Sequence, residues 1–225
     1  MLCTQCPATG GACDGEVGYY GEGKRPSWED DTLTPEPCER WGGYAKRRML
    51  AAAGLPPTLL DVSFDSYEPK NESQVQALAK VRAFAQHARP SDRMLIQGPT
   101  GIGKTHLAAA ALQHLSERAS VMFAYVPELV DAVRSEMLGG STATMDRALG
   151  VAFLVLDDLG AERSTDFVRE TLEKLCNSRQ VRKHSIIFTQ NVTPEQIAQS
   201  LGLPLMRRVM YGTATVVKIE GQPYR

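Results

Sequence analysis

The feature that most constrains this chain is a short glycine-rich stretch near its middle. Residues 98–105 read Gly-Pro-Thr-Gly-Ile-Gly-Lys-Thr and fit the pattern G-x-x-x-x-G-K-[ST]. An apolar run precedes the stretch, and a helical pattern follows it, with Leu107, Ala111 and Leu115 on one stripe. A strand, a glycine loop and a helix in this order predict a phosphate-binding loop rather than an ordinary turn.

Each residue type in this loop has a chemical reason. The glycines allow backbone conformations and close approaches that a Cβ would block. The N–H groups of the loop can then point at a polyphosphate, at the positive end of the following helix. We expect Lys104 to reach the β and γ phosphates and the Thr105 hydroxyl to ligate Mg²⁺. The predicted binding residues of the loop are Gly98, Pro99, Thr100, Gly101, Ile102, Gly103, Lys104, Thr105 and His106.

Length and charge set broad limits on the protein. With 225 residues, the chain has room for one large domain, or one domain with a small appendage. A net charge of −1 gives no global argument for nucleic-acid binding, so a DNA contact would need a local basic patch. No apolar run approaches the roughly 20 residues of a membrane span, and the N-terminus lacks a signal-peptide core. We therefore expect a cytoplasmic protein.

The cysteines are distributed unevenly. Cys3, Cys6, Cys13 and Cys38 fall in the first 38 residues, and only Cys176 follows. In a reducing compartment such a cluster favours metal binding over disulfides, and four thiolates match tetrahedral zinc. The Cys3-x-x-Cys6 spacing lets both sulfurs face one ion, whereas Cys13 and Cys38 lack a second C-x-x-C. A tail with idle thiols therefore remains an alternative.

The patterns divide the chain into three parts. Residues 1–40 form the predicted cysteine-rich zinc-binding module, and residues 41–71 a basic helix and a linker. Residues 72–225 form the predicted nucleotide-binding domain. It starts with a helix over about 72–88, whose buried positions we expect at Val75, Leu78, Val81 and Ala85.

From residue 93 onward, short apolar runs alternate with helical patterns. Strands are predicted over 94–97, 121–126, 151–156, 185–188 and 214–219. Helices are predicted over 104–118, 127–138 and 165–179, and a capping box at Thr193 starts a short fourth helix. Near-continuous apolar strands separated by helices predict an α/β fold with a parallel sheet covered by helices on both faces.

Polar residues follow two of these strands. Asp157 and Asp158 end the strand over 151–156, and ligands bind outside the carboxyl ends of parallel strands. We expect Asp157 to hold Mg²⁺ and Asp158 to polarise the attacking water, with Glu162 as a second candidate base. Asn191, after the next strand, is expected to contact the γ-phosphate or orient the water. Thr189 and Gln190 are alternatives for that role.

Three stretches together resemble a known family. Gly98-Pro-Thr-Gly-Ile-Gly-Lys-Thr-His-Leu-Ala, Leu154-Val-Leu-Asp-Asp-Leu-Gly-Ala-Glu and Phe188-Thr-Gln-Asn resemble the Walker A, Walker B and sensor 1 motifs of AAA+ ATPases. The lead-in over 55–67 is similar to the branch of DnaC/DnaI helicase loaders and IstB transposition helpers. The resemblance covers about residues 40–225. It implies a P-loop NTPase fold, Mg²⁺-dependent ATP hydrolysis to ADP and phosphate, and a replicative helicase and single-stranded DNA as partners.

The C-terminal stretch resembles the same branch. Met206-Arg-Arg-Val and the final Pro223-Tyr-Arg are similar to the box VII arginine and the terminal Tyr-Arg of the loaders. The match implies that Arg208 is an arginine finger offered to a second subunit, so that hydrolysis depends on self-association. Arg225 would be a second phosphate-sensing arginine. Arg207 remains an alternative finger, and a chain that ends at Arg225 is expected to lack a helical lid domain.

The resemblance leaves three functions open. A helicase loader would hold the helicase through residues 1–40 and contact DNA backbone through the segment over 127–150. An IstB-like transposition helper would use the same core on target DNA. A nucleotide-dependent adaptor with little turnover is the third, since Asp158 stands where Glu is commoner. The polar DNA-contact candidates are Arg134, Ser141, Thr142, Thr144 and Arg147.

Overall fold

Five short runs of apolar residues form one parallel sheet. Its strands are β1 (Arg93–Gln97), β2 (Val121–Tyr125), β3 (Phe153–Asp157), β4 (Ser185–Gln190) and β5 (Thr215–Lys218). They lie in the order β2-β3-β4-β1-β5, and every neighbouring pair is parallel. The strands of the middle of the sheet are buried along almost their whole length, as the apolar runs predict.

The computed structural model describes residues 39–161, 164–210 and 215–223, and of residues 39–45 and 194 it describes the backbone alone. The chain divides into two units, Met1–Ala52 and Ala53–Arg225. In the first unit the described part is helix α1 (Glu39–Ala52). The sheet and all other helices belong to the second. Within the described ranges, no helix combines the length and apolar character that crossing a membrane requires.

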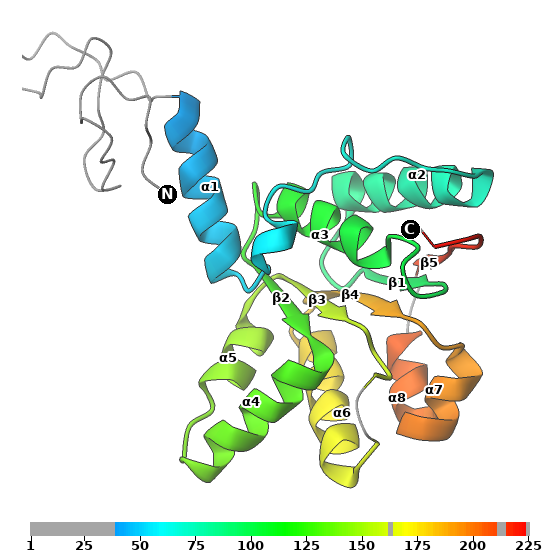
Figure 1. The fold of residues 1–225 in the computed structure, drawn as a ribbon. Helices are drawn as coiled ribbons and strands as arrows, with labels where there is room; N and C mark the ends of the chain where they lie inside the picture. The colour runs from blue at the N-terminus through cyan, green and yellow to red at the C-terminus, as the bar shows by residue number, and fades with distance from the viewer. Residues whose placement is uncertain (1–38, 162–163, 211–214, 224–225) are drawn as a thin grey trace, which may run out of the picture. The chain divides into compact units, whose positions relative to one another are not determined.

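Helices cover both faces of the sheet, which confirms the predicted layering (Figure 1). A one-turn helix η1 (Pro57–Leu59), α2 (Glu72–His87) and α3 (Lys104–Leu115) precede or follow β1. Helices α2 and α3 lie over one face, and α3 packs on the four strands from β1 to β4. The opposite face packs against α4 (Val126–Leu138), α5 (Ala143–Gly150), α6 (Asp166–Val181), α7 (Pro194–Leu201) and α8 (Leu203–Val209).

The predicted buried face of α2 is partly wrong. Val75 is 50% exposed and Leu78 is half-buried, whereas Val81 and Ala85 are buried as expected. Gln74 takes the inward position instead, because its side-chain oxygen accepts a backbone N–H from the preceding loop at 2.6 Å. A buried polar group needs such a partner, and apolar periodicity alone cannot show one.

Several elements differ from the predicted boundaries or were not predicted. The strand expected from residue 151 begins at Phe153, and α5 and α8 are short helices that the sequence pattern did not single out. The capping box at Thr193 is present as predicted, with reciprocal bonds to Gln196. Strand β4 lies between β3 and β1, so the carboxyl ends of these three strands meet at one edge of the sheet.

Candidate nucleotide-binding site

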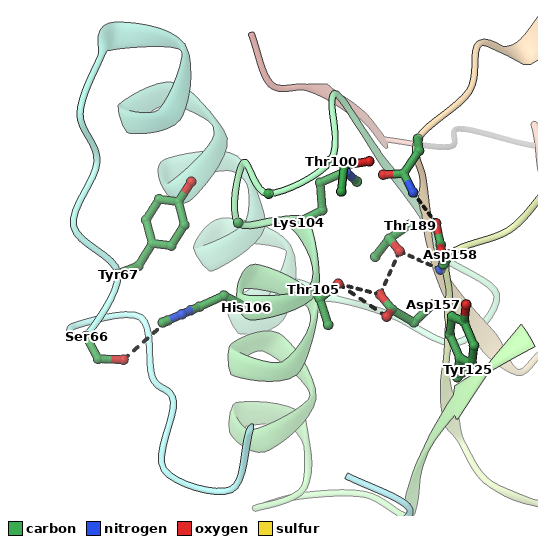
Figure 2. A pocket seen from close by; sticks show the side chains of 13 residues that line it. Ser66, Tyr67, Thr100, Lys104, Thr105, His106, Tyr125, Asp157, Asp158 and Thr189 are labelled. Carbon is green, nitrogen blue, oxygen red and sulfur yellow. Dashed lines mark hydrogen bonds between the residues drawn. The ribbon is translucent and has the colours of Figure 1, made fainter. Parts of the chain in front are cut away.

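A pocket of about 440 Å³ opens at the carboxyl ends of the strands, next to the glycine loop (Figure 2). This volume lies within the usual range for small-molecule and cofactor sites. The loop, the ends of three strands and the lead-in segment before α2 all contribute side chains. The described lining residues are Ser66, Tyr67, Thr100, Gly101, Gly103, Lys104, Thr105, His106, Tyr125, Asp157, Asp158, Thr189 and Asn191.

The shape of the loop depends on glycine at two positions. Gly103 has φ +96°, and a Cβ on it would lie 2.6 Å from the Tyr67 ring. Gly98 is as crowded, since a Cβ there would lie 2.3 Å from the carbonyl oxygen of Ile219. The Tyr67 hydroxyl donates to the Ile102 carbonyl at 3.3 Å. The lead-in segment, through Tyr67, and the residue after β5, through the Ile219 carbonyl, therefore pack directly against the backbone of the loop.

Lys104 is the first residue of α3 and is almost completely buried. Its Nζ donates to the Pro99 carbonyl at 2.7 Å, which curls the side chain back over the loop. Burial lowers the pKa of Lys104, and the nearby carboxylates of Asp158 and Asp157 act in the opposite direction. A desolvated ammonium group at the start of a helix is well suited to bind a phosphate.

Two threonine side chains meet around the carboxylate of Asp157, which ends β3. The Thr105 hydroxyl lies 3.0 and 3.2 Å from the two oxygens of Asp157, and the Thr189 hydroxyl donates to Oδ1 at 2.7 Å (Figure 2). Burial raises the pKa of Asp157, while the two threonine hydroxyls lower it less strongly. Hydroxyl and carboxylate oxygens are the ligands that Mg²⁺ prefers. Thr105 and Asp157 therefore fit the predicted magnesium role.

Asp158 lies in the turn immediately after β3, with φ +61°. Its backbone N–H donates to the Thr189 hydroxyl at 2.8 Å, and its carboxylate accepts a hydrogen bond from the side-chain amide of Asn191. A left-handed conformation at a residue other than glycine is uncommon and is held here by these contacts. The structure thus brings Asp158 and Asn191 together at the pocket, where both were expected.

The lead-in segment is attached to the start of α3 through His106. The His106 Nε2 lies 3.0 Å from the Ser63 carbonyl oxygen and 3.2 Å from the Ser66 hydroxyl, and its ring meets Tyr67 edge-on. Tyr67 and Ser66 are pocket residues that the sequence motifs did not single out. The lead-in over 55–67 was noted only as a resemblance, so contact with the loop could not be inferred from it.

Two other lining residues, Tyr125 and Thr189, were not among the main site residues predicted from the sequence. Tyr125 ends β2 and lines the pocket beside Asp157, and its place at a strand end was the available signal. Thr189 was expected only as an alternative to Asn191. In the structure Thr189 is 1% exposed and its hydroxyl is hydrogen-bonded to both acids, to the carboxylate of Asp157 and to the backbone N–H of Asp158. Gln190, the other alternative, is buried and outside the lining of this pocket, and its side-chain amide donates to the side-chain oxygen of Gln97 at 3.5 Å.

Several predicted site residues do not line the described pocket. Gly98, Pro99 and Ile102 shape the loop through backbone contacts, and the Ile102 side chain is fully buried. Arg208, on α8, contacts α6. Glu162, Arg225 and the cysteines at 3, 6, 13 and 38 lie outside the described residues. Within the described ranges no three His, Cys, Asp or Glu side chains gather as a metal-binding group.

The comparisons with known proteins agree with this geometry. The family of IstB-like ATP binding proteins matches residues 40–225. Over 184 residues the chain is 25% identical to the replicative helicase loader DnaC of Escherichia coli, which covers 80% of this chain and 75% of DnaC. Over 151 residues it is 33% identical to an insertion sequence ATP-binding protein of Sinorhizobium fredii, covering 64% of this chain and 48% of that protein.

A solved structure shows the same fold. The crystal structure of the DnaC helicase loader superposes with a TM-score of 0.67 at 28% identity, covering 73% of this chain and 100% of that one. The parallel sheet and the loop before α3 are thus those of a P-loop NTPase. Because the family match spans residues 40–225, the chain belongs to the IstB-like ATP binding protein family.

Proposed function

We propose that this chain is an ATPase that loads a replicative helicase onto single-stranded DNA. The observation that carries the proposal is its similarity to DnaC, a replicative helicase loader, over 80% of this chain and three quarters of DnaC. Similarity in sequence and in fold covers the unit that holds the pocket. The proposal therefore joins a nucleotide site built from described residues to a task taken from the relative.

In this proposal the pocket hydrolyses ATP to ADP and phosphate. Lys104 and the N–H groups of the loop bind the β and γ phosphates, and Thr105 and Asp157 hold Mg²⁺. When bound there, Mg²⁺ would neutralise charge on the phosphate oxygens. A water oxygen forms a bond to the γ-phosphorus, and the bond to the bridging oxygen of ADP breaks. Asp158 accepts the proton of the water, with Glu162 as the second candidate, and Asn191 orients the water.

Turnover in this proposal needs a second copy of the chain. The described lining of the pocket contains one lysine, Lys104, and no arginine. Phosphoryl transfer spreads negative charge over the γ-phosphate oxygens, and an added guanidinium stabilises that charge. We assign this role to Arg208 of a neighbouring subunit, with Arg225 as a second phosphate-sensing arginine. ATP would then favour a head-to-tail assembly, and hydrolysis would loosen it.

The DNA-contact candidates lie on α4, on α5 and in the turn between these helices, and they differ in the contacts they make. The Thr144 hydroxyl donates to Glu136 at 2.6 Å, and the Thr142 hydroxyl donates to Asp146 at 2.6 Å. Arg134 lies over the Phe167 ring, 4.8 Å from its centre. Ser141 and Arg147 are exposed. We propose that backbone phosphates of single-stranded DNA contact this segment through Arg134, Ser141, Thr142, Thr144 and Arg147.

Residues 1–40 are proposed as a zinc module that docks on the helicase, followed by a basic helix and linker over 41–71. The four cysteines at 3, 6, 13 and 38 would be the ligands. Purified protein is expected to contain about one zinc ion per chain by elemental analysis. A Cys6→Ser variant that keeps a full equivalent of zinc would rule out this ligand set.

The insertion sequence relative supports a second candidate, a transposition helper. Such a protein would stimulate a transposase on target DNA and would not bind a helicase. A nucleotide-dependent adaptor would bind ATP without measurable turnover. Asp158→Asn separates this last candidate from an ATPase, because it should abolish turnover of an ATPase while ATP binding remains.

A loading assay tests the proposal directly. The purified chain is mixed with the replicative helicase of the same genome and with circular single-stranded DNA coated by single-strand binding protein. We expect ATP-dependent transfer of the helicase to the DNA. Lys104→Ala should abolish this transfer, and the matched Lys80→Ala on the exposed side of α2 should not. A chain that binds ATP but neither binds the helicase nor stimulates its loading would refute the proposal.

A further inference from the structure

Arg208 is held to α6 by contacts at both its backbone and its side chain. The buried Arg93 donates through Nη1 to the carbonyl oxygen of Arg208 and through Nη2 to the carbonyl oxygen of Cys176 at 3.4 Å. The Arg208 Nε donates to the side-chain oxygen of Asn177. Its Nη1 lies 3.7 Å from a carboxylate oxygen of Glu173. The end of α8 and the guanidinium are thus both anchored.

The neighbouring arginine is different. Arg207 is exposed, and its side chain makes no hydrogen bond or ion pair with the described residues. A free arginine side chain samples many rotamers and loses that freedom when it binds. The contacts of Arg208 with α6 already restrict the rotamers of its side chain in the isolated subunit. Preorganisation of this kind favours Arg208 over Arg207 as the group that engages a phosphate.

The contacts of Arg208 with α6 leave some of its N–H donors unused. A guanidinium has five N–H donors, and the contacts with Asn177 and Glu173 use its Nε and one side of Nη1. The remaining donors suffice for a bidentate contact with phosphate oxygens.

The ion pair with Glu173 is too weak to act as a latch. Its atoms are 3.7 Å apart and both side chains are about 30% exposed, at 28% and 30%. Solvent therefore screens it, and a charge-assisted contact with a γ-phosphate in a closed interface is stronger. Glu173 therefore orients the guanidinium of Arg208 but does not prevent it from binding a phosphate.

We infer that Glu173 and Asn177 are positioning residues that hold Arg208 in place for the ATP bound by a second copy of this chain. The inference rests on the proposed function, in which Arg208 acts in trans. It adds two residues of α6 to the machinery of hydrolysis. They affect the neighbour's site and leave the chain's own pocket unchanged.

Mixing two inactive variants tests the inference. Lys104→Ala keeps Arg208 but has an impaired pocket, and Arg208→Ala keeps the pocket but lacks the finger. Mixed assemblies contain hybrid sites, in which the pocket of an Arg208→Ala subunit meets the finger of a Lys104→Ala subunit. We expect ATP hydrolysis to be restored in the mixture, and we then add Glu173→Gln or Asn177→Ala to one parent at a time.

Placement of the added change decides the result. In the finger-donating Lys104→Ala subunit, Glu173→Gln or Asn177→Ala should lower kcat on the order of tenfold, with the KM for ATP unchanged. In the Arg208→Ala subunit the same change should have no effect. This second placement also controls for folding. Arg207→Ala and the exposed α6 change Glu170→Gln, placed in the donor, should leave the restored rate unchanged.

The outcomes separate the inference from the proposed function. If the parent mixture stays inactive, or if Arg208→Ala alone remains active, the finger in trans is wrong and the inference fails with it. If the mixture is active but the added changes act equally in both placements, Glu173 and Asn177 have a general structural role. No effect in either placement would also overturn the inference while leaving the finger intact.

Discussion

The buried carboxylate of Asp157 lowers the stability of the fold, although the proposed binding of Mg²⁺ needs its charge. Asp157 is 7% exposed, and burial raises the pKa of its carboxyl group despite hydrogen bonds from two threonine hydroxyls. A carboxyl group whose pKa is higher in the folded chain than in the unfolded chain favours folding at low pH. That contribution is lost as the pH rises through the folded pKa. At neutral pH the ionised Asp157 therefore destabilises the nucleotide-free protein.

Removing this charge should stabilise the nucleotide-free protein and remove the carboxylate that is proposed to hold Mg²⁺. We predict that Asp157→Asn raises the free energy of unfolding of the nucleotide-free protein by about 1 kcal/mol at neutral pH. The gain should shrink as the pH falls through the raised pKa of Asp157, because the wild-type group is then protonated too. Thermal unfolding at several pH values measures this. A variant that is less stable than wild type at every pH would contradict the burial argument.

Lys104 is predicted to contribute to ATP binding through its charge. Replacing Lys104 by Ala removes a charge-assisted contact to phosphate and should weaken ATP binding by about 1.5–3 kcal/mol. Titration calorimetry with ATP and Mg²⁺ gives the affinity directly. Lys80→Ala, on the exposed side of α2, is the matched control and should bind like wild type. Equal affinity of the two variants would place the nucleotide elsewhere.

At the scale of single residues, the sequence predicts chemistry better than contacts. The sequence could place Lys104, Thr105 and Asp157 together, because their order along strand, loop and helix puts them at one sheet edge, and in the structure they line one pocket. Thr189 could not, because its bonds to both acids depend on β4 lying beside β3. Tyr67 lies 36 positions before Gly103, and only the folded chain shows that its ring packs under the loop.

At the scale of elements, α5, α6 and the starts of two strands are joined by one buried arginine. Arg179 is fully buried and donates to the carbonyl oxygens of Ala148, Val151, Ala152 and Ser185 at 2.5–3.1 Å. Burial lowers the pKa of its guanidinium to about 9, which leaves it protonated at neutral pH. These four carbonyl groups lie on α5, in the two residues before β3 and at the first residue of β4, and β3 and β4 both end at the pocket.

Loss of this arginine should therefore destabilise the fold. We predict that Arg179→Met lowers the free energy of unfolding by about 3 kcal/mol, because several buried carbonyl groups lose their donors. Urea denaturation followed by circular dichroism measures the change. The exposed neighbour change Arg182→Met should stay within about 0.5 kcal/mol of wild type. A loss no larger than that of the control would show that the carbonyl groups find other partners.

The sequence predicts the strands more accurately than the short helices. All five strands were predicted within two residues at their described ends, since buried parallel strands are continuous apolar runs. In the first half of α2 the inward face was predicted one position off, because Gln74 is buried through a loop hydrogen bond, whereas Val81 and Ala85 were predicted correctly. Helices α5 and α8 have eight and seven residues, too few to show a helical period against a loop.

At the scale of the whole molecule, the central claim is that the ATP site is completed by a second copy of the chain. The described pocket supplies a phosphate loop, acids and a polar amide, while Arg208 lies on α8 against α6. Sequence reasoning predicted this separation only through the family resemblance, because no pattern in the chain measures the distance between an arginine and the loop.

The most direct measurement is ATP turnover per subunit as a function of protein concentration. We predict a low rate in dilute solution that rises with concentration, at least on the order of tenfold, and then saturates. Arg208→Ala should bind ATP normally and stay at the low rate throughout. A rate per subunit that is full and constant down to concentrations at which the protein is monomeric would contradict the account.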